Sequence, residues 1–203
     1  MMDEIQKNGP ISCGISVTNE FKAYTSSSGI FLDKTGAKGS NHYVLVYGWG
    51  VDEKGNKYWL GRNSWGSSWG TNGTFKIAKG TNNLGIENLC YWGTLINTWT
   101  NDVRNRTIPA SSEPTNKLST KINYPLPPFL TSSKSVLTPR YCESSWAFSV
   151  IQMLRDRIHK TTKGRLNVDL SAQSLLNCGL GQCSSETDPF DAISYIHKYG
   201  IPE

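Results

Sequence analysis

The sequence lacks the features that mark membrane-spanning and nucleic-acid-binding proteins. No apolar run approaches the roughly 18 residues of a membrane span, and hydrophobic residues make up 37% of the chain. Lys and Arg exceed Asp and Glu by a formal charge of +5, but the basic residues are scattered singly. A nucleic-acid-binding face normally shows clustered basic residues with interleaved aromatics. We therefore expect a globular protein with no membrane span and no nucleic-acid partner.

The chain also lacks a recognisable secretory leader. It starts Met1-Met2-Asp3-Glu4, without a basic segment or an apolar core. We expect either that the protein is not secreted on a signal of its own or that this is not the true start of the gene product. Two N-glycosylation sequons, Asn72-Gly73-Thr74 and Asn105-Arg106-Thr107, point weakly to a secretory route. The five Cys residues leave at least one thiol unpaired within the chain.

The chain divides into three parts by composition. Residues 1–98 hold short apolar runs bounded by Gly or Asn, such as "NHYVLVYGWG" and "KYWLGRNSWG", and this pattern predicts a strand-rich unit. Residues 99–140 are loaded with Ser, Thr, Asn and Pro and show no helical or strand period, which indicates a linker or an extended arm. Within it, "INYPLPPFL" is an apolar strip suited to lying in a groove. Residues 141–203 are predicted to be helical.

The helical part opens with "SSWAFSVIQMLRDRIHK", whose apolar residues recur at a spacing of three and four and predict one buried face. Two shorter helices follow, "LSAQSLLNC" with Ser171 as N-cap and "FDAISYIHKYG", which ends at Gly200. The apolar positions of the first helix are Trp146, Val150, Met153, Leu154 and Ile158.

Two groups of residues could carry chemistry. His42 and Asn63 each lie at the edge of a strand-like run in the first part, and "YCESSWAFS" places Cys and Ser residues at the start of a helix in the last part. A His held by a side-chain amide and facing a nucleophile at a helix N-terminus is the Cys-His-Asn form of the nucleophile, base and orienter arrangement. The helix N-terminus favours a thiolate and can help to bind an oxyanion.

The chain resembles the papain-like cysteine peptidases, and within them the cathepsin X (cathepsin Z) group. "NGPISCGI", "NHYVLVYGWG", "YWLGRNSWGSSWG" and "LGIENLC" are similar to the C-terminal half of the family. "TPRYCESSWAFS", "LSAQSLLNCG" and "YIHKYGIPE" are similar to its N-terminal half. The resemblance covers about three quarters of the chain but with the halves in reversed order. A circular permutant, a piece of a tandem array and a partial gene model all account for that order.

The resemblance assigns roles to individual residues. His42 and Asn63 fall on the family's base and orienter, and Ser145 falls on the position of the nucleophilic Cys. The resemblance also implies that Cys142 pairs with Cys183 and Cys13 with Cys90, leaving Cys178 without its family partner. A serine hydroxyl cannot be ionised as a thiol can, so we expect Ser145, His42 and Asn63 to be non-functional as a catalytic set.

Other positions depart from the family pattern. Aligned on "PRYC", Val136 falls near the oxyanion-hole Gln, and Leu137 falls on the His that gives cathepsin X its carboxypeptidase preference. Ser184-Ser185 replaces the Gly-Gly that lines the substrate groove. An engineered change at position 145 explains a single substitution, whereas losses at separate positions favour relaxed selection on catalysis.

We expect a papain-like α+β fold, with a helical subdomain packed on a twisted, antiparallel, barrel-like subdomain. The expected function is that of a pseudopeptidase with a structural or protein-binding role, as a subunit of a larger assembly that contacts a protein partner or peptide segment. The alternatives are an active lysosomal or secreted cysteine peptidase, whose nucleophile is mutated here or supplied by an upstream repeat, and an inhibitor-like clamp. We expect no cofactor and no metal site, because His159 and His197 lack ligand-like neighbours.

Overall fold

The computed structural model describes residues 1–94, 119, 121–123, 143–178, 180 and 187–203. Several predictions from the sequence fall outside these residues. They concern Cys142, Cys183, Val136, Leu137, Ser184, Ser185, the sequon at Asn105, the strip Tyr124–Leu130 and most of the 99–140 segment.

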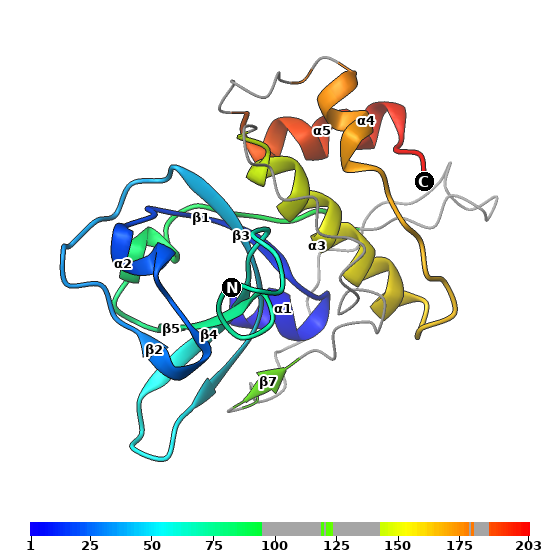
Figure 1. Cartoon of the computed structure of the whole chain (residues 1–203). Coiled ribbons are helices and arrows are strands. Elements are labelled where there is room, and N and C mark those ends of the chain that lie inside the picture. Colours follow the sequence, from blue (N-terminus) through cyan, green and yellow to red (C-terminus); the bar gives the residue numbers. More distant parts are fainter. Residues whose placement is uncertain (95–118, 120, 124–142, 179, 181–186) are drawn as a thin grey trace.

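The described residues form a strand-rich part followed by a helical part (Figure 1). The strand-rich part contains α1 (Met2–Lys7), β1 (Ile11–Ile15), α2 (Asn19–Lys22), η1 (Ser26–Ser28), β2 (Ile30–Phe31), β3 (His42–Val51), β4 (Lys57–Arg62), β5 (Thr74–Ala78), η2 (Asn83–Gly85) and β6 (Cys90–Tyr91). After it come β7 (Ile122–Asn123), α3 (Ser145–Thr161), α4 (Ala172–Asn177) and α5 (Pro189–Tyr199).

The strands form one sheet in the order β2-β5-β4-β3-β1-β6, with β7 also paired to β3. All pairings are antiparallel except that of β2 with β5. The sequence predicts a barrel-like sheet, but among the described strands this sheet stays open, with β2 and β6 at its edges. The edge strands are only two residues long, so they offer little backbone for closing a barrel.

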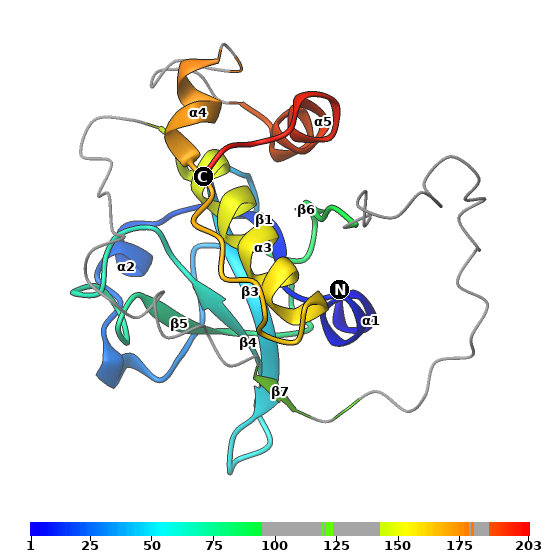
Figure 2. The same ribbon diagram turned by 90° about the vertical axis from the view of Figure 1, so that its right-hand side faces the viewer.

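Strand β3 separates two hydrophobic cores because its side chains alternate between faces. Val44 and Val46 belong to the core of the sheet part, whereas Leu45 belongs to the core around α3. Figures 1 and 2 show α3 lying along the sheet, with α4 and α5 on its other side. The start of β3 therefore lies at the junction of the two parts.

Helix α3 is buried more completely than the sequence predicts. Four of the five predicted apolar positions are buried, whereas Ile158 is only half-buried. Arg155, Asp156 and Arg157 are also buried, because the helix is enclosed by the sheet on one side and by α4 and α5 on the other. The ends of its neighbours follow the sequence signals: the Ser171 side chain caps α4 and Gly200 ends α5.

Arg157 joins the two parts through a buried guanidinium that is 1% exposed. Its nitrogens donate to the backbone oxygens of Pro10 at 2.8 Å, Gly93 at 2.7 Å and Gly9 at 3.3 Å, and to the carboxylate of Glu4 at 2.8 Å. One side chain of α3 thus holds both the beginning and the end of the strand-rich part.

The segment 99–140, which the sequence predicts to be a linker or an extended arm, contains a short strand among its described residues. Ile122 and Asn123 form β7 and pair with Trp49 and Gly48 of β3. Trp49 Nε1 also donates to the Ser119 oxygen at 3.0 Å. The strand forms because Ile122 packs on the core of the sheet part.

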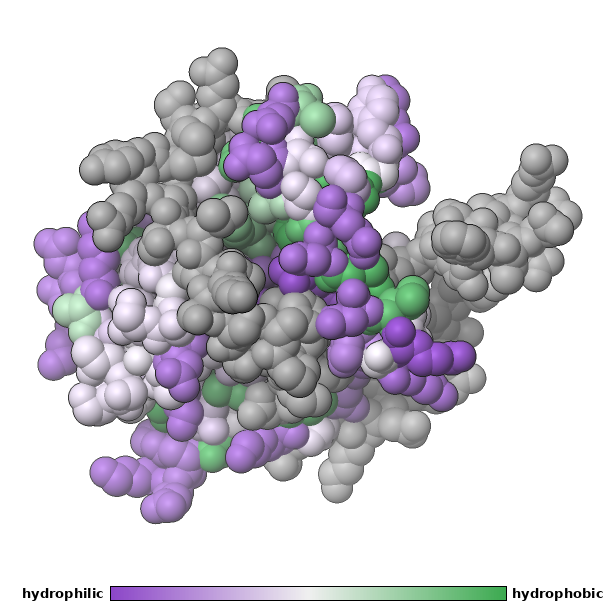
Figure 3. Space-filling view, turned by 45° about the vertical axis from the view of Figure 1, so that its right-hand side comes forward, coloured by the Kyte–Doolittle hydropathy of each residue, from purple (hydrophilic) through white to green (hydrophobic). Residues whose placement is uncertain are grey.

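Cys13 and Cys90 form a disulfide between β1 and β6, and Cys178 is a free, exposed thiol. No helix among the described residues combines the length and apolar character that crossing a bilayer requires. On the face shown in Figure 3, hydrophilic residues project around the described part, and hydrophobic residues show in small areas between them.

Candidate functional site

His42 and Asn63 are brought together by neighbouring strands. His42 is the first residue of β3 and Asn63 directly follows β4, and His42 Nε2 lies 2.8 Å from Asn63 Oδ1. The backbone N–H of Ser64 donates to the same oxygen at 2.8 Å, which identifies that atom as the carbonyl acceptor. Nε2 therefore carries the proton, and Nδ1 is left as the basic nitrogen of the ring.

Aromatic packing and burial keep His42 in its neutral form. The Trp65 ring lies 4.9 Å from the His42 ring, centroid to centroid, and His42 is only 9% exposed. Burial lowers the pKa of His42 to about 4, although the hydrogen bond to Asn63 acts in the opposite direction. At neutral pH the imidazole is uncharged.

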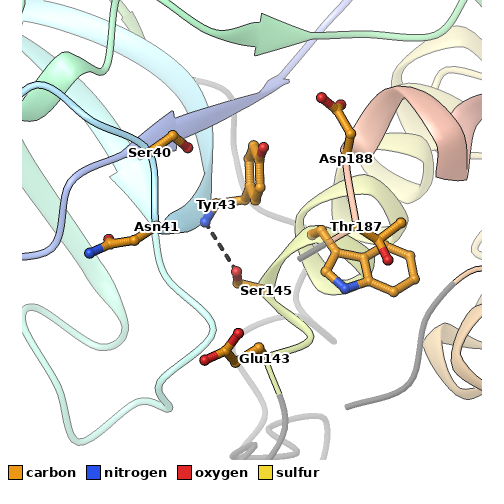
Figure 4. Close-up of a pocket in the computed structure, with 8 residues that line it drawn as sticks. Ser40, Asn41, Tyr43, Glu143, Ser145, Thr187 and Asp188 are labelled. Carbon is orange, nitrogen blue, oxygen red and sulfur yellow. Dashed lines mark hydrogen bonds between the residues drawn. The ribbon is translucent and has the colours of Figure 1, made fainter. Parts of the chain in front are cut away.

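Ser145 is the first residue of α3 and reaches the start of β3. Its Oγ accepts a hydrogen bond from the Tyr43 N–H at 3.1 Å, so it lies beside the residue that follows His42 (Figure 4). Within the described part of the chain, this bond is to Tyr43 and not to the His42 ring. The structure therefore places Ser145, His42 and Asn63 in one region, with the His–Asn pair in direct contact.

A pocket of about 240 Å³ lies next to Ser145. Figure 4 shows Ser40 and Asn41, from the loop before β3, on one side of Ser145, and Thr187 and Asp188, at the start of α5, on the other side. Sequence reasoning missed most of this lining, although the Asp-Pro pair that opens α5 is a helix-start signal that could have located Asp188. The lining residues are Ser40, Asn41, Tyr43, Glu143, Ser145, Trp146, Thr187 and Asp188.

A second group of polar residues, also missed, lies buried between β4 and α3. Arg62 Nε donates to Gln152 at 2.9 Å, and one of its terminal nitrogens lies 3.9 Å from the Asp156 carboxylate. Burial raises the pKa of Asp156 to about 6, against the opposing effect of the nearby Arg62 charge. We assign this pair to packing of the two parts, because it lines no described pocket.

Among the described residues, no three His, Cys, Asp or Glu side chains gather as metal ligands. The pocket itself presents a hydroxyl at a helix start and two carboxylates. The neutral imidazole oriented by an amide lies in the same region but outside the pocket lining. Acyl transfer needs a nucleophile that is hydrogen-bonded to its base. Here the Ser145 hydroxyl lies near the His42–Asn63 pair but bonds to Tyr43 instead, so the arrangement is incomplete.

Comparison with known proteins places this arrangement in a family. The chain is 43% identical to cathepsin Z of Onchocerca volvulus over 100 residues, covering 45% of this chain and 32% of that protein. It is 44% identical to cathepsin B-like protease 1 of Arabidopsis thaliana over 87 residues, covering 43% of this chain and 22% of that protein. The chain thus spans about a third or less of the curated relatives it matches.

Among solved structures, bromelain from Ananas comosus with the E64 inhibitor is 32% identical, with a TM-score of 0.44, covering 47% of this chain and 45% of that one. Procathepsin L 3 of Tenebrio molitor is 36% identical, with a TM-score of 0.42, covering 45% of this chain and 30% of that one. The sequence model for papain family cysteine proteases matches residues 1–94 and 131–203, which is most of the chain. The chain belongs to the papain family of cysteine proteases and has a papain-like α+β fold.

Proposed function

We propose that this chain is a catalytically degenerate member of the papain family that binds a protein or peptide without cleaving it. The observation that carries the proposal is Ser145 at the start of α3, with its Oγ engaged by the backbone N–H of Tyr43. A serine hydroxyl does not ionise near neutral pH, so no thiolate–imidazolium pair can form with His42. The resemblance of "CESSWAFS" to the family's nucleophile motif, in which Ser145 falls on the catalytic Cys, supports this interpretation.

The state of His42 also supports the loss of catalysis. A general base works best when its pKa lies near the operating pH, whereas the pKa of His42 is lowered to about 4 by burial. A thiolate beside the ring would favour the imidazolium and raise that pKa. With a neutral hydroxyl at position 145, nothing of that kind stabilises the charged ring.

The reversed order of the halves and a place in a larger assembly belong to the same proposal. The halves 1–98 and 141–203 would dock through contacts such as those of Arg157, with 99–140 as the connection. The described residues of that connection pair with β3 of the same chain, so the proposed assembly rests on the protein or peptide partner and not on this segment. Glycosylation is proposed at Asn72, which is exposed in a turn before β5.

An active peptidase is the second candidate, and one observation favours it. The contact between His42 Nε2 and Asn63 Oδ1 has the geometry of an oriented base. A nucleophile from another repeat, or a Cys in place of Ser145, would then complete the site.

The test is Ser145→Cys in a Cys178→Ala background, which removes the free exposed thiol. We expect the new thiol to alkylate with an ordinary pKa near roughly 8.5, no labelling by an epoxide-type papain inhibitor, and no measurable peptide hydrolysis. Val136, aligned with the oxyanion-hole Gln, would leave the oxyanion without a donor worth about 10²–10³ in rate.

The matched control adds His42→Ala to the same variant. If His42 does not activate the thiol, its removal leaves the alkylation profile unchanged. Hydrolysis by Ser145→Cys within about tenfold of an ordinary cathepsin, abolished by His42→Ala, would contradict the proposal and favour the second candidate. Labelling of the unaltered chain by the inhibitor would contradict it as well.

A further inference from the structure

The pocket beside Ser145 has the size of a site for one side chain. Its volume of about 240 Å³ lies below the roughly 300–1,000 Å³ of pockets that enclose drug-sized ligands. It lies where the start of α3, the loop before β3 and the start of α5 meet (Figure 4). A segment of peptide lying across this junction could place one side chain in it.

The charged side chains that line the pocket are both acidic. Glu143 precedes α3 and Asp188 precedes α5, and no Lys, Arg or His of the described residues lines the pocket. This contrasts with the formal charge of +5 on the whole chain. Glu143 is exposed and makes no ion pair within the described part of the chain. The local field therefore favours a cation.

Asp188 has a structural role but keeps capacity for a ligand. Its Oδ1 accepts from the Phe190 N–H at 2.8 Å, which caps α5, and its Oδ2 accepts from the Tyr91 hydroxyl at 2.7 Å. An ionised carboxylate has about four lone-pair sites, so these two bonds orient Asp188 without exhausting it.

A third observation points to a ligand with a hydrogen-bond acceptor. Trp146 lines the pocket and is 1% exposed, and its Nε1 has no hydrogen-bond partner among the residues that the structure describes. A buried donor without a partner is costly, and a bound carbonyl oxygen would satisfy it. Ser145 Oγ already accepts from Tyr43, so its own hydroxyl proton remains available as a second donor.

We propose that this pocket binds a Lys or Arg side chain of an extended peptide segment in a partner protein. Glu143 and Asp188 would neutralise the cationic group, while Trp146 Nε1 and the Ser145 hydroxyl would donate to the peptide carbonyl beside it. The inference rests on the proposed function, in which this region binds peptide without cleaving it.

The test uses three synthetic peptides that differ only at a central residue, which is Lys, norleucine or Glu. Fluorescence anisotropy with the full chain gives the dissociation constant of each. We expect the Lys peptide to bind about three- to tenfold more tightly than the norleucine peptide, because one or two partly exposed ion pairs supply that difference. The Glu peptide should bind most weakly. Raising the salt concentration should narrow the gap.

The variants Glu143→Gln and Asp188→Asn should each reduce the preference for Lys about two- to fivefold. Asn is also a good N-cap, so Asp188→Asn removes the charge while keeping the start of α5. Glu53→Gln is the matched control, because it removes the same charge from the exposed turn between β3 and β4. It should leave the preference unchanged.

Three outcomes would overturn the inference: a norleucine peptide that binds as tightly as the Lys peptide, no binding of any peptide, or an unchanged preference in both pocket variants. Mass spectrometry of the recovered peptides distinguishes a failure of this inference from a failure of the proposed function. Hydrolysis of a bound Lys peptide would overturn the proposed function while leaving the charge preference in place.

Discussion

The two halves of the chain contribute different residues to the candidate site. In the sheet half, His42 and Asn63 lie in direct contact at the ends of β3 and β4. In the helical half, α3 begins with Ser145, whose Oγ accepts a hydrogen bond from the backbone N–H of Tyr43. Under the proposed function, His42 and Asn63 keep the arrangement of a base and its orienter, whereas Ser145 stands where a nucleophilic Cys is expected.

Packing gives a reason for this difference. Asn63 accepts hydrogen bonds from both Ser64 N–H and His42, and His42 is buried against Trp65, so replacing either residue would leave buried polar groups without partners. Ser145 is only half-buried and finds its partner in a backbone N–H. The His–Asn pair is therefore expected to persist for structural reasons, and its presence alone is a weak argument for activity.

The largest expected effect tests what holds the sheet half together. The Cys13–Cys90 disulfide closes a loop with a sequence separation of 77, and removing such a link costs about 4 kcal/mol. Cys13→Ala with Cys90→Ala should lower the free energy of unfolding in urea by about that amount. Cys178→Ala, at an exposed free thiol, is the control and should change it by less than about 0.5 kcal/mol. An equal loss of stability in the double variant and in the control would contradict the stabilising role of the disulfide.

The next effect tests the junction between the halves. Arg157→Met removes the guanidinium that bonds to Glu4, Gly9, Pro10 and Gly93, and it leaves their acceptors without that donor. We expect a loss of about 3 kcal/mol in the free energy of unfolding, as for other broken buried ion pairs. Arg165→Met, at an exposed residue after α3, should change it little. A loss below about 1 kcal/mol would show that the halves are held elsewhere.

The third prediction uses pH to separate the halves. The pKa of Asp156 is about 6 in the folded chain, above its ordinary value of 3.8, so ionising it lowers the stability as pH rises from about 4 to 6. The pKa of His42 is about 4, below its ordinary value of 6.5, so the stability rises with pH from about 4 to 6.5. The two contributions have opposite signs and overlap between pH 4 and 6.

Single variants should reveal each contribution. Asp156→Asn removes the group whose ionisation lowers the stability as pH rises. The free energy of unfolding should therefore rise more steeply with pH between 4 and 6, by up to about 1 kcal/mol per pH unit. His42→Gln should shift the slope in the opposite direction. Urea unfolding at pH 4, 5, 6 and 7 measures both slopes. Slopes that change in the same direction in the two variants would contradict the assignments.

Much of the fold could be predicted because its signals are local. Apolar runs bounded by Gly or Asn predicted β3 and β4, and a spacing of three and four predicted α3. The Ser171 cap and the Gly200 end are also local signals. The same apolar runs predicted that His42 and Asn63 lie at strand ends. In the structure these two residues are in contact, because the two strands are neighbours in the sheet.

The features that could not be predicted from the sequence depend on packing between distant segments. Arg157 has the pattern of a solvent-facing charge within "LRDRIHK", and only the nearness of α1 and Gly93 buries it. The pocket combines Glu143 with Asp188 from two helix starts, and neither residue belongs to an apolar period. The pairing of β7 with β3 is likewise a tertiary contact, carried by Ile122 in a segment whose composition is polar.

The smallest effect concerns a buried hydroxyl pair that crosses the junction. Ser149 Oγ lies 2.7 Å from Ser12 Oγ, and it also donates to the Trp146 oxygen at 3.0 Å. The Ser149 proton is thereby used within α3, so Ser12 is the donor in the pair. Ser149→Ala leaves the buried Ser12 hydroxyl without an acceptor, whereas Ser12→Ala leaves Ser149 with its bond to Trp146 intact.

The two single variants should therefore differ. Ser149→Ala should lower the free energy of unfolding by about 1–2 kcal/mol and Ser12→Ala by about 0.5–1 kcal/mol, because an unsatisfied buried donor costs more than a lost bond. The double variant should cost less than the sum of the two, since each hydroxyl is then removed with its partner. Ser68→Ala, at an exposed serine, is the control. Additive effects would mean that the two hydroxyls do not bond across the junction, and that β1 and α3 are joined there by apolar contact alone.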